Sequence, residues 1–250
     1  MHPKVAIITG SARGIGAAIA RCLDAAGMRV VIHSKDSVTE GKAVANTCNT
    51  AFYHAADLTQ KSACQGLVAA TLERWGRIDI LVNNVGHSVH IPFNDLEAAT
   101  EELFHALFQV NVLSAWHMSL AAKAALTEAP DAAIVNISSV AGAQTLGSSI
   151  PYAVSKAALN HLTRLLATVL APDIRVNAIA PGCIDTPREG DWSTLTDTYA
   201  QTTALGRLGK PEEIAQMVLS ILHARYMTGE IITVDGGLTC SKTSCNTTPS

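Results

Sequence analysis

The chain has 250 residues, of which 48% are hydrophobic and 16% charged, and its formal net charge is −3. This composition excludes a disordered chain, and the length predicts one globular domain spanning residues 1–250. The small negative charge argues against a nucleic-acid partner, and no apolar stretch is long enough to cross a membrane.

The predicted elements alternate between strand and helix along the chain. Strands are expected at 4–9, 29–33, 50–54, 78–83, 132–138, 173–179 and 231–234, and helices at 15–26, 60–75, 100–129, 152–170 and 211–224. Such alternation, with nearly continuous apolar strands, predicts an α/β fold with a parallel sheet between two layers of helices. The small polar residues 239–250 are predicted to form a flexible tail.

The start of the chain and its cysteines bear on cellular location. The first strand is predicted to begin at residue 4, which leaves no room for a signal peptide. The six cysteines form no C-x-x-C pair and have no histidines at metal-ligand spacing. We therefore expect free thiols, a cytoplasmic protein and no metal site.

A glycine-rich segment joins the first strand to the first helix. Gly10, Gly14 and Gly16 have the spacing G-x-x-x-G-x-G, which by itself also occurs in ordinary turns. The strand before it and the helix after it favour a dinucleotide site. There, glycine permits close backbone approach, and the helix N-terminus offers free N–H groups to phosphate.

Polar or glycine residues follow the other predicted strands as well. They are His33 to Lys35, Asp57 and Leu58, Asn83 to Gly86, Ser138 and Ser139, and Pro181 and Gly182. In parallel sheets, ligands bind beyond the carboxyl ends of the strands, near the switch in strand order. We therefore expect these residues to form one site at one edge of the sheet.

Tyr152 and Lys156 carry a proposal for proton transfer. They lie four residues apart at the start of a predicted helix, so the Lys156 ammonium can reach the Tyr152 phenol. A nearby cation lowers the pKa of a tyrosine from its ordinary value of about 10. Ser139 lies thirteen residues before Tyr152, a spacing that favours it over Ser138 as a third member of the group.

Taken together, these residues resemble the short-chain dehydrogenase/reductase family over almost the whole chain, from Val5 to Gly237. The matching segments are Thr9-Gly10-(x)3-Gly14-x-Gly16, Asp57-Leu58, Asn83-Asn84-Val85-Gly86, Asn111, Ser139, Tyr152-(x)3-Lys156, Pro181-Gly182-(x)3-Thr186 and Asp235-Gly236-Gly237. One departure is Val85, where the family usually has alanine. The resemblance implies a doubly wound, Rossmann-type parallel sheet of seven strands, a nicotinamide cofactor and, commonly, a homotetramer.

The resemblance also implies roles for individual residues. Tyr152 would exchange a proton with the substrate oxygen, Ser139 would hydrogen-bond that oxygen, and Lys156 would hold the nicotinamide ribose. Asn111, inside the long predicted helix, would hold a water that links Lys156 to solvent. The implied cofactor-binding residues are Gly10, Arg13, Gly14, Ile15, Gly16, His33, Ser34, Asp57, Leu58, Asn83, Val85, Gly86, Tyr152, Lys156, Pro181, Gly182, Ile184 and Thr186.

Simpler interpretations of some of these residues stay open. Ser139 could cap a turn, Asp57 could cap the helix that follows it, and His87 and His90 could be loop residues.

The end of the second strand bears on the choice between NADP and NAD. An NAD enzyme normally places a carboxylate there to bind the ribose 2′-hydroxyl. This chain has His33, Ser34 and Lys35, which would tolerate or attract a 2′-phosphate, and Arg13 could bind that phosphate bidentately. We therefore expect NADP(H), with Asp36 as the residue that argues for NAD.

Several functions stay open at this stage. A reductase of small ketones or aldehydes is preferred, ahead of a 3-oxoacyl thioester reductase and a pteridine reductase, which often has aspartate in place of Ser139. Trp192 is a candidate lid residue for the carbonyl or alcohol substrate. A non-catalytic NADP-binding sensor is the alternative of a different class. It is disfavoured because all four catalytic positions are present.

Overall fold

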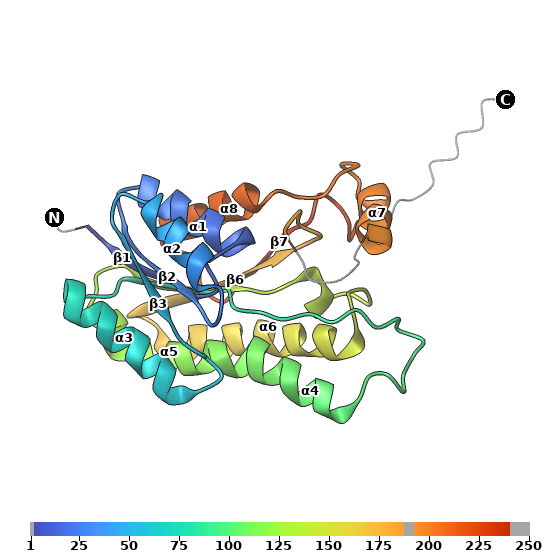
Figure 1. The fold of residues 1–250 in the computed structure, drawn as a ribbon, viewed down its shortest axis with the longest axis horizontal. Coiled ribbons are helices and arrows are strands. Elements are labelled where there is room, and N and C mark those ends of the chain that lie inside the picture. Colours follow the sequence, from blue (N-terminus) through green and yellow to red (C-terminus); the bar gives the residue numbers. More distant parts are fainter. Residues whose placement is uncertain (1–2, 188–192, 241–250) are drawn as a thin grey trace.

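A computed structural model describes residues 3–187 and 193–240, and its centre is a parallel sheet of seven strands (Figure 1). The strands are β1 Val5–Ile8, β2 Arg29–Ser34, β3 Ala51–Ala55, β4 Ile80–Asn83, β5 Ala132–Ile137, β6 Ile174–Pro181 and β7 Ile231–Val234. All seven predicted strands are confirmed, with boundaries that differ by at most two residues.

The strand order is β3-β2-β1-β4-β5-β6-β7, so the order reverses between β1 and β4. This is the doubly wound arrangement, in which the two halves of the sheet grow outward from that reversal. Loops that leave the carboxyl ends of β1 and β4 diverge there and open a crevice, which is where ligands bind in such sheets.

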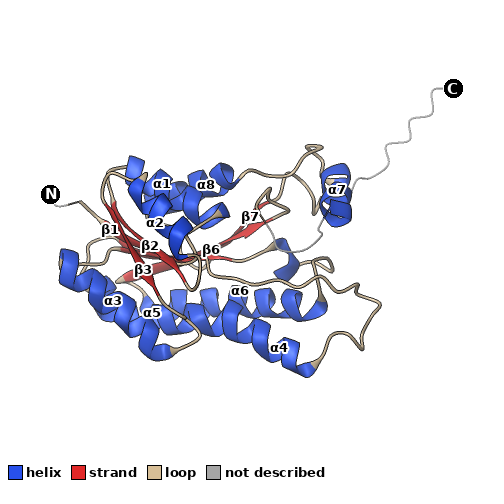
Figure 2. Cartoon of the chain, in the orientation of Figure 1, coloured by secondary structure: helices blue, strands red, loops and turns tan. Residues whose placement is uncertain are grey.

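Helices cover both faces of the sheet, as Figure 2 shows. α1 (Gly14–Ala25), α2 (Val38–Asn46) and α8 (Pro211–His223) lie on one face, and α3 (Lys61–Trp75), α5 (Ser114–Thr127) and α6 (Ile150–Leu170) lie on the other. Successive strand residues point to opposite faces, so Ile8 packs in the α1 and α8 core whereas Ile7 packs in the α3 and α5 core. None of the described helices is long and apolar enough to cross a bilayer.

The helix predicted over 100–129 is not continuous. It consists of α4 (Glu101–Phe108), a π-helical turn at Gln109–Leu113 and α5, and the Ser114 N–H donates to the Gln109 carbonyl across that turn. The sequence pattern does not reveal the break, because one widened turn barely changes the spacing of apolar residues. The turn contains Asn111, whose side chain is fully buried.

Two further helices were not predicted from the sequence. α2 is short and contains Gly41, and α7 (Ser193–Thr202) is rich in threonine and serine, so neither has a clear apolar periodicity. α7 lies beyond the end of β7, away from the two main helical layers (Figure 1).

The flexible tail was predicted to span residues 239–250, but its first residue, Thr239, is hydrogen-bonded to the turn before it. The Asp235 carboxylate accepts hydrogen bonds from the backbone N–H and the hydroxyl of Thr239, at 2.8 and 2.7 Å. Thr239 therefore belongs to the turn that follows β7. Residues 241–250 lie outside the described part of the chain.

Candidate active site

The glycine loop packs tightly against the first helix. A Cβ at Gly16 would lie 2.4 Å from the Gly10 carbonyl oxygen and 2.5 Å from the Asn84 amide nitrogen. Gly10 itself has a φ of 64°, a conformation that glycine adopts at little cost. These two glycines let α1 approach the end of β1 closely enough to put its N-terminus at the sheet edge.

The N-terminus of α1 is suited to an anion. Arg13, the residue before the helix, has extended backbone, its side chain forms no capping bond, and the first turn contains no acidic residue. The first N–H groups of the helix and its partial positive charge therefore remain for a bound phosphate. This arrangement fits the pyrophosphate of a dinucleotide, the group implied by the glycine spacing.

A groove runs from this loop along the ends of β2 and β3, and we call it the glycine-loop groove. Eight of the predicted cofactor-binding residues line it, namely Gly10, Arg13, His33, Ser34, Asp57, Leu58, Val85 and Gly86, together with Lys35, Asp36 and His87. Of the two histidines left open as loop residues, His87 therefore faces a candidate ligand site.

The imidazole of His33, which was expected to tolerate or attract a 2′-phosphate, is engaged by the backbone. Its Nδ1 accepts from the Gly10 N–H at 3.0 Å, so its Nε2 carries the proton and donates to the Ala56 carbonyl at 2.9 Å. Burial lowers the pKa of the imidazole to about 4, and the hydrogen bond to Ala56 opposes this only in part. His33 is therefore neutral at pH 7 and holds the glycine loop, so it brings no positive charge to a 2′-phosphate.

The cations of the groove are Arg13 and Lys35. The Lys35 ammonium forms a 2.9 Å ion pair with the Asp57 carboxylate, which also accepts bonds from the backbone and hydroxyl of Thr59. These bonds lower the pKa of Asp57. Asp57 thus orders the turn before α3 but does not cap that helix, whose N-cap residue is Gln60, and it remains on the wall of the groove.

Asn83 does not face the groove, although it was predicted to bind the cofactor. Its side chain is buried and donates to the Asn136 side chain at 2.9 Å, beneath the sheet edge. Its neighbour Asn84 lines the groove and donates to the carbonyls of Thr9 and Gly10, both at 2.9 Å. Because successive strand residues alternate in direction, a shift of one position separates the interior from the ligand side.

Three of the four predicted catalytic residues, all except Asn111, meet in a second cavity, which we call the central cavity. It is lined by Ile15, Ser139, Tyr152, Lys156, Pro181, Gly182, Ile184 and Thr186, and it shares Asn84, Gly86 and His87 with the glycine-loop groove. Gly14 and Gly16 lie behind this wall; a Cβ at Gly14 would contact Thr186 at 3.2 Å.

Lys156 is held in place beneath Tyr152. Its ammonium donates to the Ile137 carbonyl at 3.0 Å and lies 5.8 Å from the centre of the Tyr152 ring. Burial lowers the pKa of Lys156 to about 8, which leaves most of it charged at pH 7. Ser139 accepts from the Ala141 N–H at 3.2 Å, so it caps the short turn Val140–Gly142 and also faces the cavity.

Both polar atoms of the Asn111 side chain form hydrogen bonds with other residues of the chain. Its amide oxygen accepts from the His87 N–H at 2.7 Å, and its amide nitrogen donates to the His87 carbonyl and the Ser155 hydroxyl, at 3.0 and 2.9 Å. The side chain therefore links the segment after β4 to the helix that carries Tyr152 and Lys156. The π-helical turn points it inward to do so.

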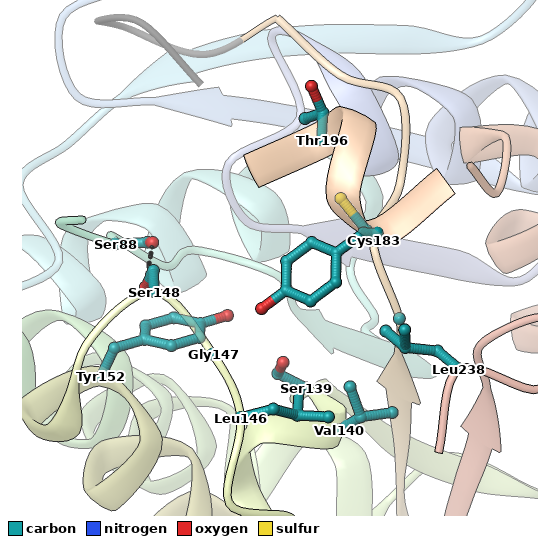
Figure 3. A pocket seen from close by; sticks show the side chains of 12 residues that line it. Ser88, Ser139, Val140, Leu146, Gly147, Ser148, Tyr152, Cys183, Thr196 and Leu238 are labelled. Carbon is teal, nitrogen blue, oxygen red and sulfur yellow. Dashed lines mark hydrogen bonds between the residues drawn. The ribbon is translucent and has the colours of Figure 1, made fainter. Parts of the chain in front are cut away.

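A third cavity, the outer cavity, opens beyond Tyr152 (Figure 3). Its walls include Val140, Leu146, Ser148, Cys183, Thr196, Tyr199 and Leu238, and it shares Ser88, Ser139, Tyr152 and Gly182 with the central cavity. Sequence reasoning missed most of these residues. They come from five separate segments, and no local motif marks them; Trp192, the predicted lid residue, lies outside the described residues.

Comparisons with known proteins agree with this geometry. A family model described as enoyl-(acyl carrier protein) reductase matches residues 10–239. The chain is 42% identical to the second ketoacyl reductase assigned to granaticin polyketide synthase of Streptomyces violaceoruber, over 93% of this chain and 95% of that protein. The chain belongs to the short-chain dehydrogenase/reductase family.

Members with other named substrates are also similar. L-fucose dehydrogenase of Oryctolagus cuniculus is 35% identical, over 94% of this chain and 84% of that protein. A crystal structure of a short-chain dehydrogenase/reductase from Burkholderia xenovorans superposes with a TM-score of 0.89 at 35% identity, over 96% of this chain and 99% of that one. This protein is therefore an oxidoreductase of a family that uses nicotinamide cofactors.

Proposed function

We propose that the protein is an NADP(H)-dependent oxidoreductase that interconverts a carbonyl and an alcohol, with Tyr152 as proton donor or acceptor. One observation carries this proposal: Ser139, Tyr152 and Lys156 line a cavity that joins the glycine-loop groove to the outer cavity. A carbonyl in the outer cavity would meet the proton donor and the reactive end of a dinucleotide in the groove at one point.

Tyr152, Lys156 and Ser139 have separate roles in the reduction of a carbonyl. A bound reduced nicotinamide supplies a hydride to the carbonyl carbon. The Tyr152 hydroxyl gives its proton to the carbonyl oxygen, and the Lys156 ammonium stabilises the negative charge left on the phenol. The Ser139 oxygen accepts from Ala141, so its own proton remains to hydrogen-bond the reacting oxygen. One carbonyl, one NADPH and one proton become one alcohol and one NADP⁺.

NADP(H) is favoured over NAD(H) by the charge of the groove. Arg13 and Lys35 line it, and neither His33 nor Ser34 at the end of β2 is a carboxylate. Asp36 and Asp57 also lie on the wall, but Asp57 is already paired with Lys35. A 2′-phosphate would therefore meet the Arg13 guanidinium and compete with Asp57 for the Lys35 ammonium, and both cations bind phosphate well.

Small ketones and aldehydes remain the preferred substrate class, as expected from the sequence. The similarity to a ketoacyl reductase supports the second class, 3-oxoacyl thioesters. Absorbance of the reduced nicotinamide, followed with NADPH and NADH in parallel, tests the cofactor and the class together. We expect NADPH to be consumed with a small ketone, an aldehyde or acetoacetyl thioester. Consumption of NADH alone would overturn the cofactor assignment, and consumption of neither would refute these substrate classes.

A homotetramer is part of the same proposal. Seven exposed large apolar side chains lie on α4, α5 and α6, namely Phe104, Phe108, Trp116, Leu120, Val154, Leu165 and Val169. Such a surface is costly in water and is typical of subunit contacts. Sedimentation at micromolar concentration should give four chains, and a monomer would contradict this.

A cytoplasmic location is the last part of the proposal. It is supported by the described cysteines, which form no disulfide with one another.

A further inference from the structure

Two serines form a hydrogen-bonded pair on the wall of the outer cavity. The Ser88 hydroxyl donates to the Ser148 oxygen at 2.8 Å, and both residues line the cavity together with Ser139 and Tyr152. Figure 3 shows the pair beside the Tyr152 ring. Ser88 also lines the central cavity, so the pair lies near the point where a substrate would meet the cofactor.

The protein fixes both serines before any ligand binds. The backbone of His87, next to Ser88, is held on its N–H and its carbonyl by Asn111. The Ser148 carbonyl accepts from the Ile91 N–H at 2.7 Å, and its neighbour Ser149 caps α6 at Tyr152. The pair is therefore preorganised relative to the catalytic tyrosine, which reduces the cost of binding a ligand there.

The pair has one proton left to give. The bond between the serines uses the Ser88 proton, and each hydroxyl carries only one. Among the described residues, none accepts the Ser148 proton. A ligand oxygen that enters the cavity can take that hydrogen bond.

The rest of the outer cavity restricts the charge of the ligand. The other described lining residues are the apolar Val140, Leu146 and Leu238, the hydroxyl-bearing Thr196 and Tyr199, and Gly147, Gly182 and Cys183. None of the described lining residues is a lysine, an arginine or a carboxylate. Burial of a carboxylate without a cation is costly, so this wall suits an uncharged molecule.

We propose that the Ser88–Ser148 pair binds a second oxygen of an uncharged oxo substrate, placed near the carbonyl that Tyr152 and Ser139 contact. A neutral 3-oxo ester or thioester has this pattern, with its reacting ketone and its ester carbonyl separated by one carbon. This inference rests on the proposed function. It narrows the substrate from ketones in general to neutral ketones that carry a neighbouring oxygen.

The test compares three substrates with NADPH. Ethyl acetoacetate has the second oxygen, 2-heptanone has the same chain length without it, and acetoacetate carries a negative charge. The ester group itself makes a ketone more reactive, so the informative quantity is the change in the substrate ratio between variants. Ser148→Ala should lower kcat/KM about tenfold for ethyl acetoacetate and less than twofold for 2-heptanone, since one hydrogen bond to the substrate is lost.

Controls separate recognition from general damage. Ser119→Ala also removes a buried hydroxyl, which donates to the Ala115 carbonyl within α5. Ser119 does not line the outer cavity, so this variant should leave the substrate ratio unchanged. Ser88→Ala should shift the ratio in the same direction as Ser148→Ala. Calorimetric titration of the NADP⁺ complex with ethyl acetoacetate, a pair that cannot react, should show a matching loss of affinity in Ser148→Ala.

Three results would contradict the role of the serine pair, the uncharged substrate class or the proposed function. An equal fall for the ester and for 2-heptanone in Ser148→Ala would show that the pair only supports the fold. A wild-type preference for acetoacetate over its ethyl ester would refute the uncharged class. If no ketone is reduced with either cofactor, the proposed function fails and this inference with it.

Discussion

The two sides of the active site are built in different ways. On the glycine-loop side, polar side chains mostly hold backbone: His33 bonds Gly10 and Ala56, and Asn84 bonds Thr9 and Gly10. On the outer side, hydroxyls from distant segments face an open cavity, as Ser88, Ser148 and Tyr199 do. A site for a constant ligand is made rigid by side chains that bond to backbone, whereas the wall that meets the variable ligand leaves hydroxyl groups facing the cavity.

The largest predicted effect on activity comes from substitution of Tyr152, which lies where the two sides meet. Tyr152→Phe should lower kcat about a thousandfold and leave the Kd of NADPH within twofold, because only the proton donor is removed. Stopped-flow turnover and fluorescence titration measure the two quantities. Unchanged turnover would refute the proton-transfer role of Tyr152 and leave the sensor interpretation in place.

The glycine-loop side should also be sensitive to acid, through His33. Its pKa is lowered to about 4 in the folded protein, so between pH 6.5 and 4 the unfolded chain binds more protons than the folded one. The stability from neutral His33 is therefore present above pH 6.5 and is lost as the pH falls toward 4. The loss should be about 3 kcal/mol of unfolding free energy.

Urea denaturation at pH 7 and pH 4 measures this loss, with His33→Gln as the comparison. Glutamine can accept from Gly10 and donate to Ala56 without titrating. The wild-type chain should lose about 3 kcal/mol more than this variant does. Parallel pH dependence in the two chains would mean that other groups cause the effect.

Close packing on the same side gives a third prediction. Gly16→Ala should destabilise the fold by about 1–3 kcal/mol and weaken NADPH binding, since its Cβ would meet the Gly10 carbonyl at 2.4 Å. Gly66→Ala is a matched control, because nothing lies within 4 Å of a Cβ there, and it should gain about 0.5–1 kcal/mol. Thermal unfolding compares the two, and equal shifts would contradict the packing argument.

The choice of cofactor gives a smaller effect. Arg13→Ala should raise the KM of NADPH about tenfold, or about 1.4 kcal/mol, by removing a cation from the 2′-phosphate. The KM of NADH should change less than threefold, since NADH lacks that phosphate. Steady-state kinetics with both cofactors provide the measurement, and equal effects would place Arg13 elsewhere on the dinucleotide.

The turn after β7, which supports the wall of the outer cavity, gives the smallest effect. The Asp235 carboxylate accepts from the backbone of Gly237 and from Thr239, and so orders the turn that places Leu238 in the cavity wall. Asp235→Asn should raise the substrate KM about threefold, with no change in the Kd of NADPH, because only part of this bonding is lost. A change confined to the Kd of NADPH would instead link the turn to the other side.

The sequence alone determined the parts that depend on short-range spacing. The apolar strands, the glycine loop and the pair Tyr152 and Lys156 each lie within one element or one turn, so local geometry fixes them. Only the tertiary structure decided that Asn84 and not Asn83 faces the groove, that His33 is neutral, and that the Asn111 turn is π-helical. It also decided which residues form the outer cavity, because burial, hydrogen-bond partners and contacts between residues as distant as Ser88 and Leu238 arise only when the chain folds.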